Sequence, residues 1–287
     1  MGRTLVFQTD FGVADGAVCA MYGVAMSVSD RLRICDLTHD IPPYNVWEAS
    51  YRLWQTVDYW PEGTVFVSVV DPGVGCSRRS VVARTHGGHY VITPDNGTLT
   101  HLHLVHSLES VRTFDETENK LPHARQSYTF YGRDVYAYVG ARLAAKMIDF
   151  ESFGTAVPVA SVADLTTEQA RCEAGQLIGM IDVLDVRFGN LWTNIDFHLL
   201  GKLGIRYGAR LKVIIRNNHR CVYENTMTFV RSFAAVAIGE PLIYVNSLEY
   251  IGIAINQGAF AQAYSIGTGA NWQIALEKCE SERSSKI

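Results

Sequence analysis

Apolar positions in the first half of the chain fall into short continuous runs, which are separated by longer stretches with helical spacing. The runs at 4–8, 32–36 and 64–70 predict strands, while 17–26 and 46–57 predict helices, the second with a Trp/Tyr-rich face. Continuous apolar strands separated by helices indicate a sheet that is covered on both faces. We therefore predict an N-terminal α/β domain whose central sheet is covered by helices.

A hairpin and two further helices complete this domain, which we place at residues 1–160. The hairpin is expected between strands at 80–84 and 90–93, because a His-Gly-Gly-His sequence separates them. A short helix is expected from about residue 96, and a long helix over 133–147.

The pattern changes after about residue 160, where helical stretches nearly disappear. Only 197–203 still suggests a helix. Six strand candidates follow at the spacing of a small barrel or sandwich: 177–184, 210–216, 221–229, 242–245, 251–255 and 272–276. We expect a smaller antiparallel β domain over 170–280 and a frayed polar tail at 281–286.

The composition is that of an ordinary soluble protein. With 287 residues, of which 48% are hydrophobic and 19% charged, the chain is not disordered and is long enough for two domains. Lys and Arg number 25 against 29 Asp and Glu, without a basic run, so nucleic acid is not an expected partner. Apolar runs are far shorter than the ~20 residues that span a membrane, and Met1 leads straight into a strand rather than a signal peptide. We predict a cytoplasmic protein.

The six cysteines and nine histidines do not form a metal-binding pattern. The cysteines are scattered singly, without a Cys-x-x-Cys pair, and the closest histidines bracket a Gly-Gly turn or lack a nearby carboxylate. We therefore predict reduced thiols and no metal.

Polar residues gather where the predicted N-terminal strands end. In open α/β sheets, ligands bind beyond the carboxyl ends of the strands. The three segments are Thr9-Asp10-Phe11-Gly12 with Asp15, Asp71-Pro72-Gly73-Val74-Gly75 with Arg78, and Pro94-Asp95-Asn96-Gly97. Each alone is explained as well by a helix cap or a turn. Together they indicate a site.

Asp71 and Arg78 are the most specific pair among these residues. A carboxylate directly after a buried strand, with a guanidinium seven positions later across a Gly/Pro loop, makes a fixed charged pair that keeps the acid ionised. A structural salt bridge that holds the loop is the alternative.

The second domain contributes a segment that runs from Asp185 to Asn194 and includes Phe188, Asn190 and Trp192. Aromatic faces beside Asn and Asp side chains suit a nucleobase, whose plane stacks and whose edge accepts and donates hydrogen bonds. A turn at 187–190 followed by an ordinary strand explains the same residues.

In order along the chain, these motifs resemble those of the S-adenosyl-L-methionine (SAM) hydroxide adenosyltransferases, the adenosine-forming SAM hydrolases related to fluorinase and chlorinase. They are Thr9-Asp-Phe-Gly with Asp15, Asp71-Pro-Gly-Val-Gly-x-x-Arg78, Pro94-Asp-Asn-Gly, Thr129-Phe-Tyr-Gly-Arg-Asp134, Asp185-x-x-Phe-Gly-Asn190-x-Trp-Thr-Asn194 and Asn246-Ser247. The resemblance implies an N-terminal α/β domain and a C-terminal β-barrel. It also implies a homotrimer that binds SAM between the N-terminal domain of one subunit and the C-terminal domain of its neighbour.

The resemblance also implies a set of site residues. Asp10 is expected to bind the ribose hydroxyls, with Asp15 and Tyr44 beside it. Asp185 and Ser247 are expected at the amino and carboxylate ends of the methionine. The adenine is expected between Phe188, Asn190 and Phe229, and the motifs add Phe130, Gly132, Trp192 and Asn246 to the substrate-binding set.

Asp71 and Arg78 match two members of the family's water-handling trio, while the third, a histidine in the hydrolases, is Tyr131 here. Halide-using relatives carry tyrosine at that position but an aromatic residue where this chain has Asp71, and a carboxylate there disfavours Cl⁻ or F⁻. We therefore expect SAM hydrolysis to adenosine and L-methionine, with catalytic Asp71, Arg78 and Tyr131 and no cofactor. A SAM-dependent halogenase and a non-catalytic SAM- or adenosine-binding protein are the alternatives.

Overall fold

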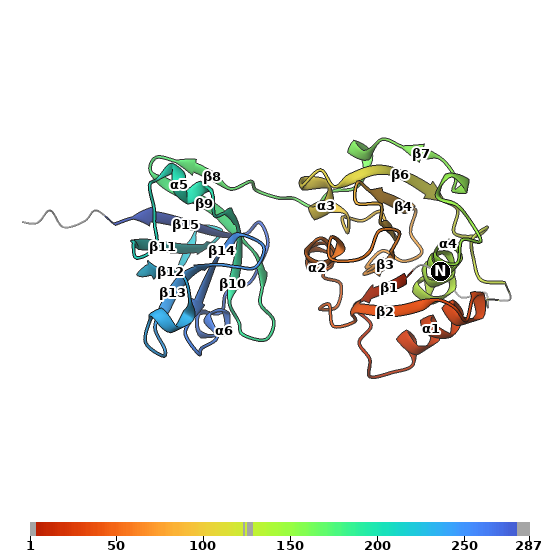
Figure 1. Ribbon diagram of the computed structural model, residues 1–287, viewed down its shortest axis with the longest axis horizontal. Helices are drawn as coiled ribbons and strands as arrows, with labels where there is room; N and C mark the ends of the chain where they lie inside the picture. The colour runs from red at the N-terminus through yellow and green to blue at the C-terminus, as the bar shows by residue number, and fades with distance from the viewer. Residues whose placement is uncertain (1–3, 123, 125–128, 280–287) are drawn as a thin grey trace, which may run out of the picture. The chain divides into compact units, whose positions relative to one another are not determined.

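The computed structural model describes residues 4–122, 124 and 129–279. These belong to two units, which meet in the sequence between Leu165 and Thr166 (Figure 1). The expected tail at 281–286 lies outside the described residues.

A seven-stranded sheet forms the centre of the N-terminal unit, in the order β2-β1-β3-β5-β4-β6-β7. The first four of these strands are parallel, and β4, β6 and β7 are antiparallel to their neighbours. The strands are β1 (Thr4–Thr9), β2 (Arg33–Thr38), β3 (Val65–Val69), β4 (Ser80–Thr85), β5 (Tyr90–Pro94), β6 (Leu108–Phe114) and β7 (Ala156–Val157).

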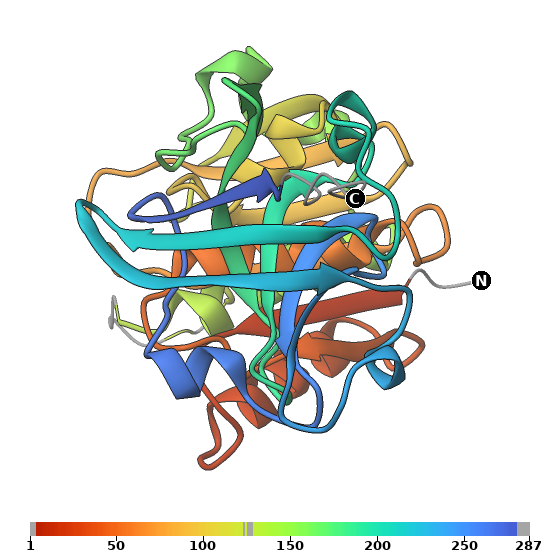
Figure 2. The same ribbon diagram turned by 90° about the vertical axis from the view of Figure 1, so that its left-hand side faces the viewer.

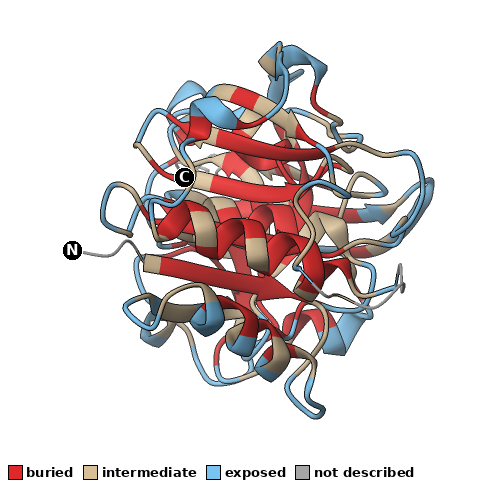
Figure 3. Ribbon diagram, turned by 90° about the vertical axis from the view of Figure 1, so that its right-hand side faces the viewer, coloured by how far each residue is buried: buried red, intermediate tan, exposed pale blue. Residues whose placement is uncertain are grey.

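Helices cover both faces of this sheet. Successive residues of a strand point to opposite faces, so Leu5 and Phe7 pack in one apolar cluster and Val6 in another. The first cluster includes residues of α1 (Ala17–Val28) and α4 (Tyr138–Ala144), the second residues of α2 (Val46–Val57) and α3 (Thr100–Leu104). Figure 3 shows the strands mostly buried. The predicted α/β sheet covered by helices is confirmed.

Two elements of this unit differ from the prediction. The long helix expected over 133–147 is a π-helical turn, η1 (Gly132–Ala137), followed by the shorter α4, which ends before Lys146 with its left-handed backbone. Strand β6 was not predicted, because its buried residues Leu108, Val111 and Phe114 recur every third position rather than alternating. Two 3₁₀ turns lie outside the sheet, η2 (Phe150–Ser152) and η3 (Val159–Ser161).

The C-terminal unit is a closed barrel of seven strands (Figure 2). The strands run in the order β10-β14-β13-β12-β11-β15-β9, and pairing of β9 with β10 closes the barrel; β8 extends it outside β9. The elements are β8 (Arg171–Glu173), β9 (Gln176–Leu184), β10 (Leu191–Asp196), α5 (Leu199–Lys202), β11 (Arg210–Asn217), β12 (Arg220–Phe229), η4 (Phe233–Ala235), β13 (Pro241–Val245), β14 (Tyr250–Ile255), α6 (Phe260–Tyr264) and β15 (Trp272–Lys278).

The predicted β-barrel is therefore confirmed, with one exception to its antiparallel order. Strands β12 and β13 pair in parallel, over two residue pairs. The turn expected at 187–190 is present and β10 follows it, while the ligand-binding role of this segment stays a prediction. Helix α6 was not predicted. In the part of the chain that the structure describes, no helix is both long and apolar enough to span a bilayer.

Candidate functional site

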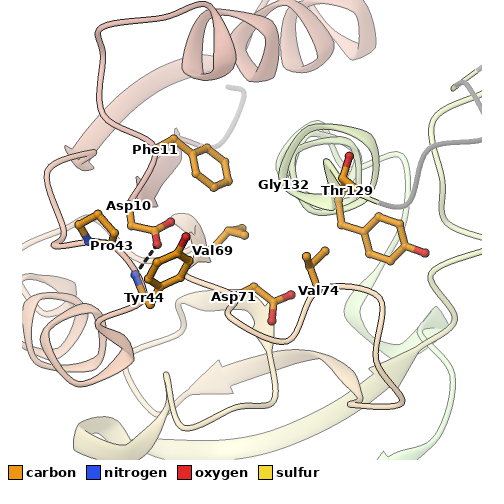
Figure 4. A pocket seen from close by; sticks show the side chains of 10 residues that line it. Asp10, Phe11, Pro43, Tyr44, Val69, Asp71, Val74, Thr129 and Gly132 are labelled. Atoms are coloured by element: carbon orange, nitrogen blue, oxygen red, sulfur yellow. Dashed lines mark hydrogen bonds between the residues drawn. The ribbon is translucent and has the colours of Figure 1, made fainter.

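A pocket of ≈ 350 Å³ opens at the carboxyl ends of β1 and β3 in the N-terminal unit. Figure 4 shows Asp10, Pro43 and Tyr44 on one side of it, Thr129 and Gly132 on the other, and Asp71 with Val74 between them. The lining residues are Asp10, Phe11, Pro43, Tyr44, Val69, Asp71, Val74, Thr129, Tyr131 and Gly132. Five of the sequence-predicted site residues therefore line one pocket: Asp10, Tyr44, Asp71, Tyr131 and Gly132.

Asp10 holds the loop that carries Tyr44. The backbone N–H of Tyr44 donates to Asp10 Oδ2 at 2.8 Å. Tyr44 has a φ of 67°, in the left-handed region that few residues other than glycine adopt, and its side chain is exposed. A strained backbone that persists at a pocket is held there by its surroundings, and the hydrogen bond from the Tyr44 N–H to Asp10 provides one such constraint.

A hydrogen-bond network that runs from buried Thr9 and His39 to exposed Asp36 fixes the backbone on the other side of Asp10. Thr9 Oγ1 accepts from the N–H of Phe11 at 3.2 Å and lies 2.7 Å from His39 Nδ1. His39 Nε2 lies 3.0 Å from Asp36 Oδ1, and Asp36 also accepts from the Tyr22 hydroxyl. Burial and the hydrogen bond to Asp36 raise the pKa of Tyr22, so its hydroxyl remains a donor. This network positions the Asp10–Phe11 loop from behind.

The charged pair predicted from the sequence is present at the end of β3. Arg78 Nε lies 3.0 and 2.9 Å from the two carboxylate oxygens of Asp71, and Nη2 donates to Oδ2. The N–H of Gly73 also donates to Oδ1 at 3.2 Å. The side chains of Asp71 and Arg78 are only 5% and 8% exposed. Asp71 faces the pocket, whereas Arg78 does not line it and supports Asp71 from behind.

Arg78 has further partners that sequence reasoning missed. Its Nη1 donates to Glu116 Oε1 at 2.6 Å and to Ser80 Oγ at 3.1 Å. Although burial alone lowers the pKa of Arg78, its hydrogen bonds to Asp71 and Glu116 raise it above the ordinary value. Burial raises the pKa of Tyr136, whose hydroxyl lies 2.5 Å from Ser80 Oγ. The guanidinium is therefore a permanent cation between two carboxylates.

The helical turn η1 forms the opposite wall of the pocket. Tyr131 directly precedes it and is 6% exposed. A Cβ atom at Gly132 would lie 2.8 Å from the ring of Phe11, so only glycine allows this close packing. Phe11 in turn packs edge-on against Phe130, at 5.7 Å between ring centroids. π-Helical turns are rare in proteins overall, and those that occur are often found at functional sites.

A second, larger pocket of ≈ 980 Å³ lies in the C-terminal unit. It is lined by Asp185, Arg187, Phe188, Asn190, Trp192, Arg231, Ser232, Phe233, Tyr244, Val245, Asn246, Ser247, Ile255, Asn256, Gln257, Gly258 and Ala259. Six of these were predicted site residues: Asp185, Phe188, Asn190, Trp192, Asn246 and Ser247. The barrel therefore brings the end of β9, the start of β10 and the end of β13 to one place.

The turn between β9 and β10 explains the Asp-x-x-Phe-Gly-Asn motif. Gly189 has a φ of 67°, and a Cβ atom there would lie 2.8 Å from that of Ala259. The N–H of Asp185 donates to the carbonyl of Asn190 at 2.9 Å, and Asn190 Nδ2 donates to Asp185 Oδ2 at 3.3 Å. Phe188, at the tip of this turn, is 68% exposed and offers an aromatic face to a planar ligand.

Polar atoms on β10, β13 and the loop after it complete this pocket. Trp192 Nε1 donates to the Tyr244 hydroxyl at 2.9 Å, and burial raises the pKa of Tyr244 to about 12. Asn246 Oδ1 accepts from the N–H groups of Leu248 and Tyr250 at 2.9 and 3.0 Å. Its buried Nδ2 has no hydrogen-bond partner among the described residues. A buried N–H group without a partner in a pocket wall can donate a hydrogen bond to an acceptor atom of a ligand.

Three predicted substrate-binding residues lie outside both pockets. Asp15 is exposed and its Oδ1 accepts from the N–H of Ala17, the first residue of α1, at 2.8 Å. Phe130 packs behind Phe11 rather than on the pocket surface. Phe229 is buried in the barrel core and stacks on Tyr207 at 4.4 Å, because this residue of β12 faces inward.

The motif around Asp95 also has a structural explanation. Asp95 pairs with Arg79, and its Oδ1 accepts from the N–H of Ala163 at 2.8 Å. Asn96 Nδ2 donates to the carbonyl of Val70 at 2.9 Å, one residue before Asp71. These residues hold the end of β3 in place and do not line the pocket.

Comparisons with known proteins agree over most of the chain. Residues 5–154 match the SAM hydroxide adenosyltransferase N-terminal domain, and 179–273 match the C-terminal domain. An (R)-S-adenosyl-L-methionine hydrolase of Salinispora tropica is 34% identical, over 93% of this chain and 96% of its own. A fluorinase of Actinopolyspora mzabensis is 28% identical, over 94% and 96%. The crystal structure of an uncharacterized conserved protein from Thermotoga maritima superposes with a TM-score of 0.84 at 31% identity, over 96% of this chain and 100% of that one.

Proposed function

The chain belongs to the SAM hydroxide adenosyltransferase family, and we propose that it hydrolyses SAM to adenosine and L-methionine. The relatives include proteins named as SAM hydrolases and proteins named as fluorinases, so family membership alone leaves the nucleophile open. The observation that carries the proposal is the carboxylate of Asp71 in the pocket wall, held in one orientation by Arg78.

In the proposed reaction, water attacks the ribose C5′ in line with the departing sulfur. The O–C5′ bond forms as the C5′–S bond breaks, and the bonding electrons go to the sulfur of methionine. A sulfonium is already an activated leaving group, so the reaction needs no metal or cofactor. Asp71 accepts a hydrogen bond from the water and then its proton, which passes to the solvent.

Most of the rate gain in this reaction is expected from orientation. Holding the reacting atoms in line contributes up to about 7–11 kcal/mol, whereas a general base contributes about 10²–10⁴-fold. Both oxygens of Asp71 accept hydrogen bonds from Arg78, which fixes the carboxylate plane. Tyr131 lines the same pocket, and we assign to its hydroxyl the role of orienting the water.

Halide transfer is the second candidate function, and Tyr131 favours it, since halide-using relatives carry tyrosine at this position. Product analysis by chromatography after incubation with SAM separates the possibilities. We expect adenosine, both without chloride and with high chloride. 5′-Chloro-5′-deoxyadenosine would identify a halogenase, and neither product would identify a SAM- or adenosine-binding protein.

We further propose that the protein is a cytoplasmic homotrimer, in which the N-terminal pocket of one copy and the C-terminal pocket of its neighbour hold one SAM molecule. Each pocket on its own offers only part of the expected contacts: carboxylates for ribose and water in one, aromatic and amide groups in the other.

Mixed assemblies test this arrangement. Asp71→Asn and Asp185→Asn each remove one half of the site. When the two variants are co-expressed in equal amounts, random mixing restores about a quarter of the sites, because half of each set of pockets is intact. We expect about that fraction of wild-type hydrolysis from the mixture. A mixture no more active than the separate variants would show that both halves come from one copy.

A further inference from the structure

We propose that Glu116 is a positioning residue that holds Arg78 and makes the charged cluster behind the pocket anionic, so that water rather than a halide ion is admitted beside Asp71. This inference rests on the proposed hydrolysis of SAM. Glu116 does not line the pocket. It follows the unpredicted strand β6 and lies 38 residues from Arg78 in sequence.

The geometry holds Arg78 from both sides. Two of its nitrogens, Nε and Nη2, face Asp71, and the third, Nη1, donates to Glu116 Oε1 at 2.6 Å. A guanidinium is planar, so hydrogen bonds along two of its edges fix its orientation. Glu116 therefore prevents Arg78 from turning away from Asp71, and the carboxylate that faces the water keeps its direction.

The charges explain why a second carboxylate matters. Asp71 and Arg78 alone form a pair with a formal charge of zero, which repels an anion only weakly. With Glu116 the cluster holds two carboxylates and one guanidinium, so its formal charge is negative. Inside a protein this charge opposes the entry of Cl⁻ or F⁻. Water carries no charge and is not excluded.

Local structure places Glu116 independently of Arg78. Asp115 Oδ1 accepts from the N–H groups of Thr117 and Glu118, at 2.7 and 3.2 Å, and so fixes the turn that contains Glu116. The Thr117 hydroxyl, which also donates to Oδ1, and these two N–H groups hold the pKa of Asp115 below its ordinary value. Ser80 Oγ donates to Glu116 Oε1 at 2.5 Å. The side chain of Glu116 is thus oriented toward the cluster and is only 19% exposed.

Glu116→Gln tests the proposal, with Glu118→Gln as the matched control because Glu118 is exposed and two residues away. Adenosine formation is measured over a range of chloride concentrations, with gluconate keeping the ionic strength constant. For Glu116→Gln we expect kcat to fall about tenfold, because glutamine can still accept from Arg78 but lacks the charge that strengthens this hydrogen bond, while KM for SAM changes less than about threefold. We also expect chloride to inhibit Glu116→Gln more strongly than the wild type, or to yield chlorinated product.

Glu116→Asp keeps the negative charge on a side chain that is one methylene shorter. It provides a second measurement if Glu116→Gln does not fold. It is expected to lower kcat and to retain the chloride response of the wild type. The inference is overturned if Glu116→Gln matches Glu118→Gln in both kcat and chloride response, or if Glu116→Asp leaves kcat unchanged. Failure of the wild type to form adenosine would instead reject the proposed function.

Discussion

Asp71→Asn is expected to abolish most of the SAM hydrolysis and to leave SAM binding nearly intact. Asparagine has almost the same shape as aspartate but cannot take a proton from the attacking water. Loss of a general base lowers kcat by about 10²–10⁴-fold, which corresponds to about 3–5 kcal/mol of barrier. The dissociation constant for SAM, measured by isothermal titration calorimetry, should change by less than about threefold, because adenine and methionine are expected to bind elsewhere.

Asp40→Asn is the matched control, since Asp40 is exposed and does not line the pocket. Asp71→Asn also leaves Arg78 with one carboxylate partner fewer, so thermal unfolding of both variants must be compared with the wild type. A folded Asp71→Asn protein that forms adenosine at the wild-type rate would refute the role assigned to this carboxylate.

Gly132→Ala is expected to weaken SAM binding by about tenfold or more. The new Cβ atom would lie 2.8 Å from the ring of Phe11, closer than such atoms approach, so the ring must move. Phe11 directly follows Asp10, which is expected to bind the ribose. Overpacking of this kind costs about 1–3 kcal/mol, and each 1.4 kcal/mol that appears in binding is a tenfold change in affinity. Calorimetric titration with SAM measures the effect.

Gly23→Ala provides the control for this change. Gly23 lies in α1 with nothing within 4 Å of a Cβ atom, so alanine there should leave binding unchanged and stabilise the helix. The double variant Gly132→Ala/Phe11→Leu removes most of the ring and should recover part of the stability. Unchanged SAM affinity in a folded Gly132→Ala protein would contradict the packing argument.

The sequence placed Asp10 and Asp71 at one edge of the sheet because both residues follow apolar strands closely. Asp10 comes after β1 and Asp71 soon after β3, and these neighbouring parallel strands end at the same edge of the sheet. Arg78 is also predictable, since a short Gly/Pro loop limits its distance from Asp71. The contact of Glu116 with Arg78 is not predictable. It depends on the position of β6, whose apolar residues lack strand periodicity.

In the barrel, too, only part of the pocket could be predicted from the sequence. The β9–β10 turn was recognisable from its Gly-Asn pair and its aromatic residues, and Asn246 and Ser247 from the motif resemblance. Whether one residue of a strand faces the core or the pocket depends on register, which the sequence specifies weakly near strand ends. Phe229 lies in the barrel core and does not line the pocket, so the adenine contact that the family resemblance implied stays a prediction. Tyr244, in β13, and Arg231, in the loop after β12, carried no signal in the sequence, because neither belongs to a motif.

The left-handed backbone of Tyr44 implies a trade-off between the stability of the empty protein and its readiness to bind. A non-glycine residue in this region costs about 1–3 kcal/mol, and the hydrogen bond that the Tyr44 N–H donates to Asp10 offsets part of that. Glycine would remove the strain but also the aromatic side chain at the rim and the constraint on the loop. The chain therefore retains a strained backbone at Tyr44, and the pocket rim is already in place before a ligand binds.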